Sequence, residues 1–255
     1  MDNQRRIITD NETLRAQYRS LKRGDLFIGR VRMSPSEEHI LLDLLDRGII
    51  LFPEAPAQQS ARSKTFQALL FKEFMPPLTE PVHDIHRLME CMNLYSRNSV
   101  EKVVTKLDRA NAGRGIFLWN TLEDVYTQAS LGGIPFPFVI QPFIEECRDI
   151  RVIILDDYRE SYWRENSHNF RNNLHCGGKS QPCTLYDSQL ALCREVMTRG
   201  KFPYAHIDLM VTQSGESFLG EINLRGGIKG AQIHPDTYRE KIAAIHQAAE
   251  LRHSS

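Results

Sequence analysis

Apolar residues recur along the first quarter of the chain with two periods, one typical of strands and one typical of an amphipathic helix. The runs GDLFIGRV (24–31) and IILF (49–52) predict short strands. Between them, Ser34-Pro35-Ser36-Glu37 offers an N-cap, a proline at the first helical position and a glutamate at the third. We therefore predict a small parallel strand–helix–strand unit, followed by a loop over 53–60 (PEAPAQQS).

The later two thirds of the chain predict an α+β arrangement. Residues 61–74 have a helical pattern whose apolar stripe is expected to face a core, and the stripe consists of Phe66, Leu69, Leu70 and Phe74. Further helices are predicted over about 83–94, 121–130, 186–199 and 235–251, and further strands over 102–107, 115–119, 138–143, 149–155 and 160–166. A hairpin over 204–223 precedes the last helix.

Composition narrows the class of protein. Thirty-two basic and 32 acidic side chains balance, so neither a duplex-coating protein nor an acidic scaffold is indicated, and no nucleic-acid partner is expected. Five cysteines without a Cys-x-x-Cys pair argue against a disulfide framework or a structural zinc site. No apolar run approaches the roughly 20 residues that span a bilayer, and the amino-terminal residues lack the apolar core of a signal peptide. A cytoplasmic location without membrane contact is therefore expected.

The predicted hairpin brings polar side chains together. If Ser214-Gly215 is a two-residue turn, Asp208 lies opposite Glu221, and Asn223 shares their face. Two facing carboxylates repel each other unless a cation lies between them, and oxygen donors of this kind suit Mg²⁺. The alternative is a solvated polar face, and a slip of one residue would separate the two carboxylates.

Lys106 ends an apolar strand and precedes a loop that contains Gly113 and Gly115. Backbone N–H groups of such a loop can bind phosphate oxygens while the lysine supplies a positive charge. A tight hairpin would explain the glycines equally well.

Seven segments in order resemble ATP-grasp proteins, and within them the RimK-type glutamate ligases and the relatives of glutathione synthetase. These segments are SKTFQALLF with Lys64, VVTKLDRANAGRG with Lys106, IQPFIEE, DIRVIIL with Arg151, FRNNLHCGG, HIDLM with Asp208, and GEINLRGG with Glu221 and Asn223. The resemblance covers about residues 61–230. It implies two α+β subdomains that grip ATP, at 59–140 and 141–255, after a short α/β amino-terminal unit at 1–58.

The resemblance also implies a role for each matching residue. Nucleotide contacts fall to Lys64, Lys106, Gly113 and Gly115 at the phosphates, to Gln141, Phe143 and Ile144 at the adenine, and to Glu146 at the ribose. One or two Mg²⁺ ions, or Mn²⁺ in their place, would be held by Asp208, Glu221 and Asn223. The catalytic set would be Arg151, Arg171, Asn173 and Arg225, which lie near the transferred phosphate or the acyl substrate.

The activity that the resemblance implies is ligation. A carboxylate would attack the γ-phosphate to give an acyl phosphate, and an amine or thiol would then displace phosphate. The substrates would be small molecules or peptides, and homodimers are common in the family. Arg225 stands where RimK-type ligases usually have small residues, proline and glycine, so their substrates are not transferred to this chain. An ATP-grasp kinase and a nucleotide-binding module without turnover are the alternatives.

Overall fold

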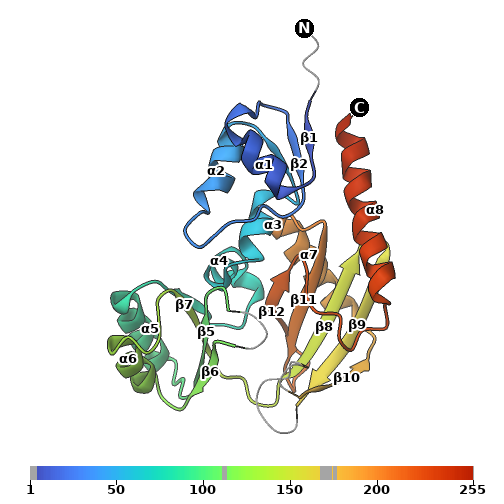
Figure 1. Cartoon of the computed structure of the whole chain (residues 1–255). Coiled ribbons are helices and arrows are strands. Elements are labelled where there is room, and N and C mark those ends of the chain that lie inside the picture. The colour runs from blue at the N-terminus through green and yellow to red at the C-terminus, as the bar shows by residue number, and fades with distance from the viewer. Residues whose placement is uncertain (1–4, 111–113, 167–173, 175–176, 255) are drawn as a thin grey trace.

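The computed structural model describes residues 5–110, 114–166, 174 and 177–254. Three of the predicted site residues, Gly113, Arg171 and Asn173, lie outside the described residues. Three sheets follow one another along the chain, and Figure 1 shows the amino-terminal sheet beside one end of the other two.

The amino-terminal unit is the predicted parallel arrangement. Its sheet has the order β1-β2-β3 and consists of β1 (Ile7–Ile8), β2 (Leu26–Ile28) and β3 (Ile50–Phe52). Both pairs of neighbouring strands are parallel. Three short helical segments accompany it, α1 (Asn11–Gln17), η1 (Tyr18–Ser20) and α2 (His39–Asp46). Leucine, isoleucine and phenylalanine side chains of these elements form one buried cluster.

Two local predictions for this unit are wrong. The helix α2 begins at His39 and not at Pro35, because Ser36 has a positive φ of 71° that a helix cannot contain. Glu37 still accepts a hydrogen bond from the Ser34 N–H at 2.6 Å, so the motif forms a turn instead of a cap. The predicted loop over 53–60 contains the helix α3 (Ala55–Ser60), which has a proline in its first turn.

The helix α4 (Lys64–Leu70), followed by η2 (Lys72–Phe74), buries a face that overlaps the predicted one only in part. Leu69 is 67% exposed, whereas Thr65, Gln67 and Ala68 are buried. Leu70 and Phe74 of the predicted stripe do pack against the core. Gln67 is buried as well because the partner of this helix is partly a strand edge, whose backbone groups attract a polar side chain. Gln67 supplies that side chain.

The central sheet is antiparallel with the order β4-β7-β5-β6. Its strands are β4 (Glu80–Val82), β5 (Val103–Leu107), β6 (Ile116–Trp119) and β7 (Phe138–Pro142). The helices α5 (Ile85–Arg97) and α6 (Leu122–Ser130) lie together beside it, as Figure 1 shows. Their apolar faces form a second buried cluster with the sheet, around Leu88, Val125 and Phe138.

The carboxy-terminal sheet is antiparallel with the order β10-β9-β8-β11-β12. Its strands are β8 (Arg148–Leu155), β9 (Tyr158–Glu165), β10 (Lys179–Pro182), β11 (Tyr204–Val211) and β12 (Ser217–Asn223). The helices α7 (Asp187–Gly200) and α8 (Pro235–Ser254) accompany it. Within the described part of the chain, no helix has the length and apolar character needed to cross a membrane.

The hairpin of β11 and β12 pairs Asp208 with Glu221 and His206 with Asn223, as predicted. The predicted two-residue turn, however, is wrong. The N–H of Thr212 bonds to the carbonyl of Glu216, so the loop is one residue longer and Gly215 closes it at φ 85°. Leu209 pairs with Leu219, so Gly220 is an extra residue that restores the predicted register on its far side. The extra residue in the loop and the extra residue at the bulge offset each other, so Asp208 still pairs with Glu221.

Replacing Gly215 with alanine tests this closure. No heavy atom lies within 4 Å of an added Cβ, so the cost is backbone strain alone. We expect Gly215→Ala to lower the free energy of unfolding by about 1 kcal/mol, measured by urea unfolding. Gly215→Asn should lower the free energy of unfolding by less, because asparagine tolerates the left-handed region. An alanine variant as stable as the parent chain would contradict the assigned loop.

Candidate active site

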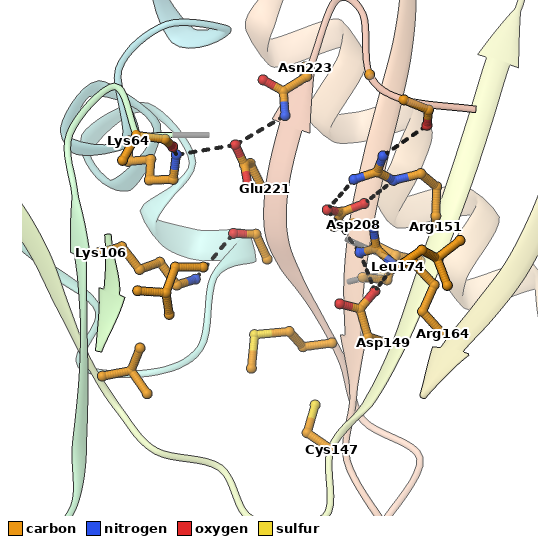
Figure 2. A pocket seen from close by; sticks show the side chains of 18 of the residues that line it. Lys64, Lys106, Cys147, Asp149, Arg151, Arg164, Leu174, Asp208, Glu221 and Asn223 are labelled. Carbon is orange, nitrogen blue, oxygen red and sulfur yellow. Dashed lines mark hydrogen bonds and ion pairs between the residues drawn. The ribbon is translucent and has the colours of Figure 1, made fainter. Parts of the chain in front are cut away.

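A cavity of about 740 Å³ is lined by residues of both large sheets and of the amino-terminal unit. Figure 2 shows Lys64 and Lys106 on one side and Asp208, Arg151 and Arg164 on the other, with the β12 residues between. The cavity gathers these predicted site residues: Lys64, Lys106, Gln141, Phe143, Ile144, Glu146, Arg151, Asp208, Glu221, Asn223 and Arg225. The structure brings these residues together in one cavity, and their proposed roles remain predictions.

Gln67 fixes the edge of the carboxy-terminal sheet against α4. β12 is an edge strand, and Ile222 lies between the two residues predicted to bind metal. The Gln67 side-chain oxygen accepts from the Ile222 N–H at 3.0 Å, and its side-chain nitrogen donates to the Ile222 carbonyl at 2.9 Å. The same nitrogen donates to the Ser60 carbonyl at 2.7 Å. Gln67 is 2% exposed and therefore replaces the strand partner that this edge would otherwise lack.

Lys64 begins α4, three residues before Gln67, and reaches the same strand. Its Nζ lies 3.4 Å from Glu221 Oε1 and donates to the carbonyl of Ala110 at 2.5 Å. Asn223 donates from its side-chain nitrogen to Glu221 Oε1 at 3.1 Å. Glu221 thus has a cation on one side and an amide on the other, and about a quarter of its side chain (26%) stays exposed to the cavity.

Lys106, on β5, faces the same strand from the central sheet. Its Nζ lies 3.4 Å from the carbonyl of Gly220, the bulge residue, which is a long hydrogen bond. Burial lowers the pKa of Lys106; Glu221 opposes the shift and Lys64 adds to it. Two lysines that face one carboxylate leave net positive charge in this part of the cavity, which favours an anion such as a phosphate.

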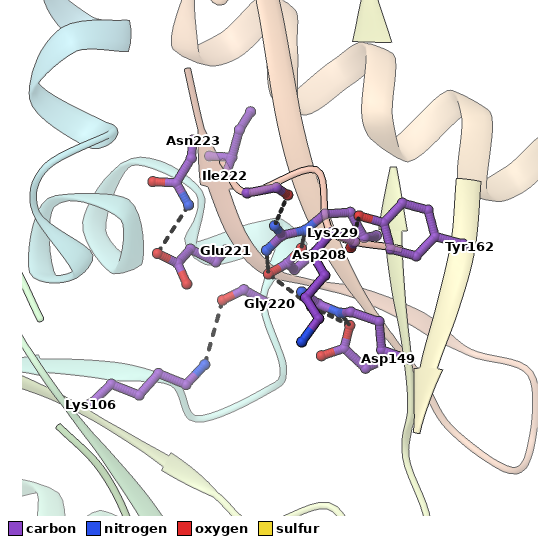
Figure 3. Close-up of polar contacts among 12 residues, drawn as sticks. Lys106, Asp149, Tyr162, Asp208, Gly220, Glu221, Ile222, Asn223 and Lys229 are labelled. Atoms are coloured by element: carbon purple, nitrogen blue, oxygen red, sulfur yellow. Dashed lines mark hydrogen bonds and ion pairs between the residues drawn. The ribbon is translucent and has the colours of Figure 1, made fainter. Parts of the chain in front are cut away.

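Asp208 lies on the opposite side of β12 from this group (Figure 3) and contacts two arginines (Figure 2). Arg151 donates to its two oxygens at 2.6 and 2.8 Å, and Arg164 Nη2 lies 3.0 Å from Oδ2. Burial raises the pKa of Asp208, but both arginines outweigh that effect and hold it well below its usual range. Asp208 is therefore a carboxylate at neutral pH.

Arg164 and Asp149 belong to this site and were not predicted. Arg164 donates to Asp149 Oδ1 at 3.0 Å from Nε and 2.5 Å from Nη2. Burial raises the pKa of Asp149 to about 6, although Arg164 opposes the shift. A sequence signal existed, because Asp149 and Arg151 are two apart on one predicted strand and therefore share a face. The partner on β9 could only be identified from the register, which pairs Asp149 with Arg164.

The oxygen donors predicted for a metal ion are divided between two settings. Glu221 and Asn223 contact each other and line the cavity, which fits a hard cation that prefers oxygen ligands. Both oxygens of Asp208 already accept from arginines. Among the described residues, no three histidine, cysteine, aspartate or glutamate side chains are grouped to hold a metal. Glu221 and Asn223 thus fit Mg²⁺ directly, whereas Asp208 would share its oxygens between the cation and the arginines.

Two of the residues predicted to contact the nucleotide also have a structural role. Gly115 has a φ of 79°, and a Cβ there would lie 2.7 Å from the Ala110 side chain. Its carbonyl accepts from the N–H of Leu107 at 2.8 Å, so the tight hairpin accounts for this glycine. Gln141 is 3% exposed, and its side-chain nitrogen lies 3.9 Å from the sulfur of Met210, so it joins the two sheets at the cavity wall.

Comparison with known proteins assigns the class. The chain belongs to the family of RimK-like ATP-grasp domains, whose family model matches residues 60–245. A probable alpha-L-glutamate ligase of Sodalis glossinidius (strain morsitans) is 25% identical over 141 residues. That match covers 52% of this chain and 47% of the relative, so it spans about half of each. The predicted family resemblance is confirmed.

Solved structures confirm the ATP-grasp fold. D-cycloserine synthetase DcsG matches with a TM-score of 0.62 and 13% identity, over 88% of this chain and 83% of that one. D-alanyl-alanine synthetase A from Vibrio cholerae matches with a TM-score of 0.59 and 13% identity, over 87% and 77%. A RiPP-associated ATP-grasp ligase of Chryseobacterium gregarium, in complex with ADP and a leader and core peptide, matches at 0.56 with 16% identity, over 84% and 66%.

Removing the Gln67 side-chain amide should loosen the strand that carries Glu221 and Asn223. We expect Gln67→Leu to weaken binding of the ATP analogue AMPPNP with Mg²⁺ by about tenfold, because two buried backbone groups of Ile222 lose their partner. Calorimetric titration measures this. Gln59→Leu, on the preceding helix, is the control and should bind as the parent chain does. Equal affinity in the Gln67 variant would contradict the positioning role.

The buried imidazole of His206 should make stability depend on pH. His206 donates to or accepts from the Tyr238 hydroxyl at 2.9 Å, and Gly226 packs against its other ring nitrogen. Burial lowers the pKa of His206 to about 3, and Arg151 adds to the shift. Below the ordinary value of 6.5 the unfolded chain binds a proton that the folded chain does not, so stability is lost as pH falls toward 3.

The free energy of unfolding of the parent chain should fall, relative to that of His206→Gln, by up to about 1.4 kcal/mol per pH unit below pH 6.5, measured by denaturant unfolding. Asp149 acts in the opposite direction between pH 6 and 4, but it is present in both proteins and cancels in the difference. His83→Gln, which removes an exposed imidazole, should follow the parent curve. Parallel curves for the parent and His206→Gln would contradict a neutral buried His206.

Proposed function

We propose that this chain is an ATP- and Mg²⁺-dependent ligase that joins a carboxylate to an amine through an acyl phosphate. The observation that carries the proposal is one cavity in which two lysines, a carboxylate–amide pair and an arginine–aspartate network converge. Membership of the RimK-like ATP-grasp family and the fold shared with ligase structures support it. The matched relative is a probable alpha-L-glutamate ligase.

The first step of this chemistry transfers a phosphoryl group. A carboxylate oxygen of the substrate forms a bond to the γ-phosphorus, the bond from that phosphorus to the β,γ-bridging oxygen breaks, and ADP leaves. Lys64 and Lys106 bind the phosphates and neutralise their charge, since both project into the cavity from the side of the central sheet. Gln141, Phe143, Ile144 and Glu146 form the adenosine side of the same cavity.

The second step forms the amide. The amine nitrogen bonds to the acyl carbon, the bond from that carbon to the phosphate oxygen breaks, and the nitrogen loses a proton while phosphate leaves. Arg151 stabilises the negative charge on the transferred group, and Arg164 holds Asp208 in place. Arg171 and Asn173 are proposed for the same region. Bound Mg²⁺ would neutralise phosphate charge, and Glu221, Asn223 and Asp208 would hold it.

The substrates are proposed to be small molecules or peptides with a carboxylate and an amine. A structurally similar ligase was solved with a leader and core peptide, which makes peptides part of the test panel. A cytoplasmic location, a homodimer and the absence of nucleic-acid partners remain predictions from the sequence.

A panel of carboxylic acids and amines, incubated with ATP and Mg²⁺, tests the proposal by ADP release and mass spectrometry of the products. A ligase gives free phosphate and an amide only when both substrates are present. A phosphorylated product that persists in the presence of every amine would identify a kinase instead. Binding of ATP without turnover over the whole panel would identify a non-catalytic module.

Glu221→Gln should lower turnover by about 100-fold or more, because the neutral amide cannot balance Lys64 and the cation. Glu216→Gln is the matched control, since Glu216 is exposed on the same hairpin and should leave turnover unchanged. Urea unfolding of both variants confirms that they fold. Unchanged turnover in Glu221→Gln would remove this residue from the reaction.

A further inference from the structure

Arg30, two residues beyond the end of β2, is the residue of the amino-terminal unit that lines the active-site cavity. Arg225, which follows β12 by two residues, lines the same cavity. Across the ranges that the structure describes, neither guanidinium forms an ion pair with a carboxylate, whereas Arg151 and Arg164 in the same cavity do. Two arginines from separate units of the fold thus share one hollow without a protein counter-ion.

The backbone around Arg30 is held in place by buried side chains. Gln58, which is 1% exposed, donates to the carbonyl of Gly29 at 3.2 Å and accepts from the N–H of Val31 at 2.8 Å. Asn11 donates to the carbonyl of Arg30 itself at 2.9 Å. Three hydrogen bonds therefore fix one short stretch of chain, and the Arg30 side chain is the part of it that faces the cavity.

The connection to the nucleotide side is short. Gln58 belongs to α3, and α4 with Lys64 begins four residues after α3 ends. Arg62, in the link between them, donates to the carbonyls of Val31 and Met33, which follow Arg30 in the chain. Arg30 is therefore positioned with respect to Lys64 through a single stretch of chain and its hydrogen bonds, as a substrate-binding group requires.

The charges around Arg30 are of like sign. Burial lowers the pKa of Arg30, and the charge of Arg225 lowers it further; burial and the charge of Arg30 do the same for Arg62. Near Arg225, the hydroxyl of Tyr204 shares a hydrogen bond of 3.0 Å with His246. Arg30 is half-buried and Arg225 is exposed at the cavity. Like charges near a half-buried guanidinium are unfavourable unless an anion joins them, and an arginine pair suits a planar carboxylate.

Arg30 lies at a distance from the adenosine side of the cavity. Figure 1 shows the amino-terminal unit at one end of the two large sheets, while the connection between β7 and β8, which carries Phe143 and Glu146, lies toward the other. An anion at Arg30 is therefore on the substrate side of the phosphates.

We propose that Arg30 and Arg225 bind a carboxylate of a substrate that does not itself react, so that one substrate carries an anion beyond the group that is phosphorylated. This rests on the proposed ligase function and names its substrate class, an amino acid or the carboxyl end of a peptide. The guanidinium of Arg30 is the specificity-determining group, because a neutral substrate would leave it without a counter-ion.

The test measures binding of free L-amino acids and of their α-carboxamides to the protein, with and without AMPPNP and Mg²⁺, by calorimetric titration. The parent chain should bind at least one acid about tenfold or more tightly than its amide. Arg30→Gln should remove this preference, and Arg30→Lys should retain part of it. Arg32→Gln is the matched control, because Arg32 is exposed on the same stretch of chain and does not line the cavity.

The outcomes separate the proposals. Equal binding of acids and amides by the parent chain, including no binding of either series, would overturn the carboxylate site. A loss of AMPPNP affinity in Arg30→Gln would also overturn it, because Arg30 would then serve the nucleotide phosphates. If AMPPNP fails to bind the parent chain, the ligase proposal fails, but the preference for acids can still be measured without nucleotide.

Discussion

The paired hydrogen bonds between Gln67 and Ile222 are the contact on which the site depends. An edge strand ordinarily leaves every second N–H and carbonyl unpaired, and such an edge is free to twist or to pair elsewhere. Here a buried glutamine satisfies both groups of the residue that separates Glu221 from Asn223. Because Lys64 stands nearly one helical turn earlier on α4, the same contact sets the lysine 3.4 Å from Glu221.

The electrostatics of the cavity follow from how its charges are paired. Asp208 and Asp149 are neutralised by Arg151 and Arg164, which form a closed network within the carboxy-terminal sheet. Across β12, Lys64 and Lys106 share Glu221, and this side keeps excess positive charge. The division explains how one cavity can hold carboxylates for a cation and still attract a polyanion: the negative side chains are mostly balanced before a ligand arrives.

Much of the fold was predictable from periodicity, and the family from the order of short motifs. The pairing of Asp208 with Glu221 was predicted correctly, although the loop was one residue too short, because the bulge at Gly220 compensates. The buried face of α4 was predicted only in part, since Gln67 is buried by its hydrogen bonds to a strand that lies 155 residues later in the chain. Arg164 was not predicted for a similar reason, because its partners lie on other strands. Alternation along a strand indicates which side chains share a face, but only the pairing of strands shows which charged side chains contact each other.

The placement of α4 has a mechanical consequence. This helix packs against β4 and β7 of the central sheet, while its glutamine holds β12 of the other sheet. If the angle between the two sheets changes while this contact holds, the pivot lies close to Ile222, and groups move farther the more distant they are from it. Glu221 and Asn223, which flank Ile222, would then move least, and the far parts of the central sheet would move most. The cavity could widen without displacing the carboxylate–amide pair.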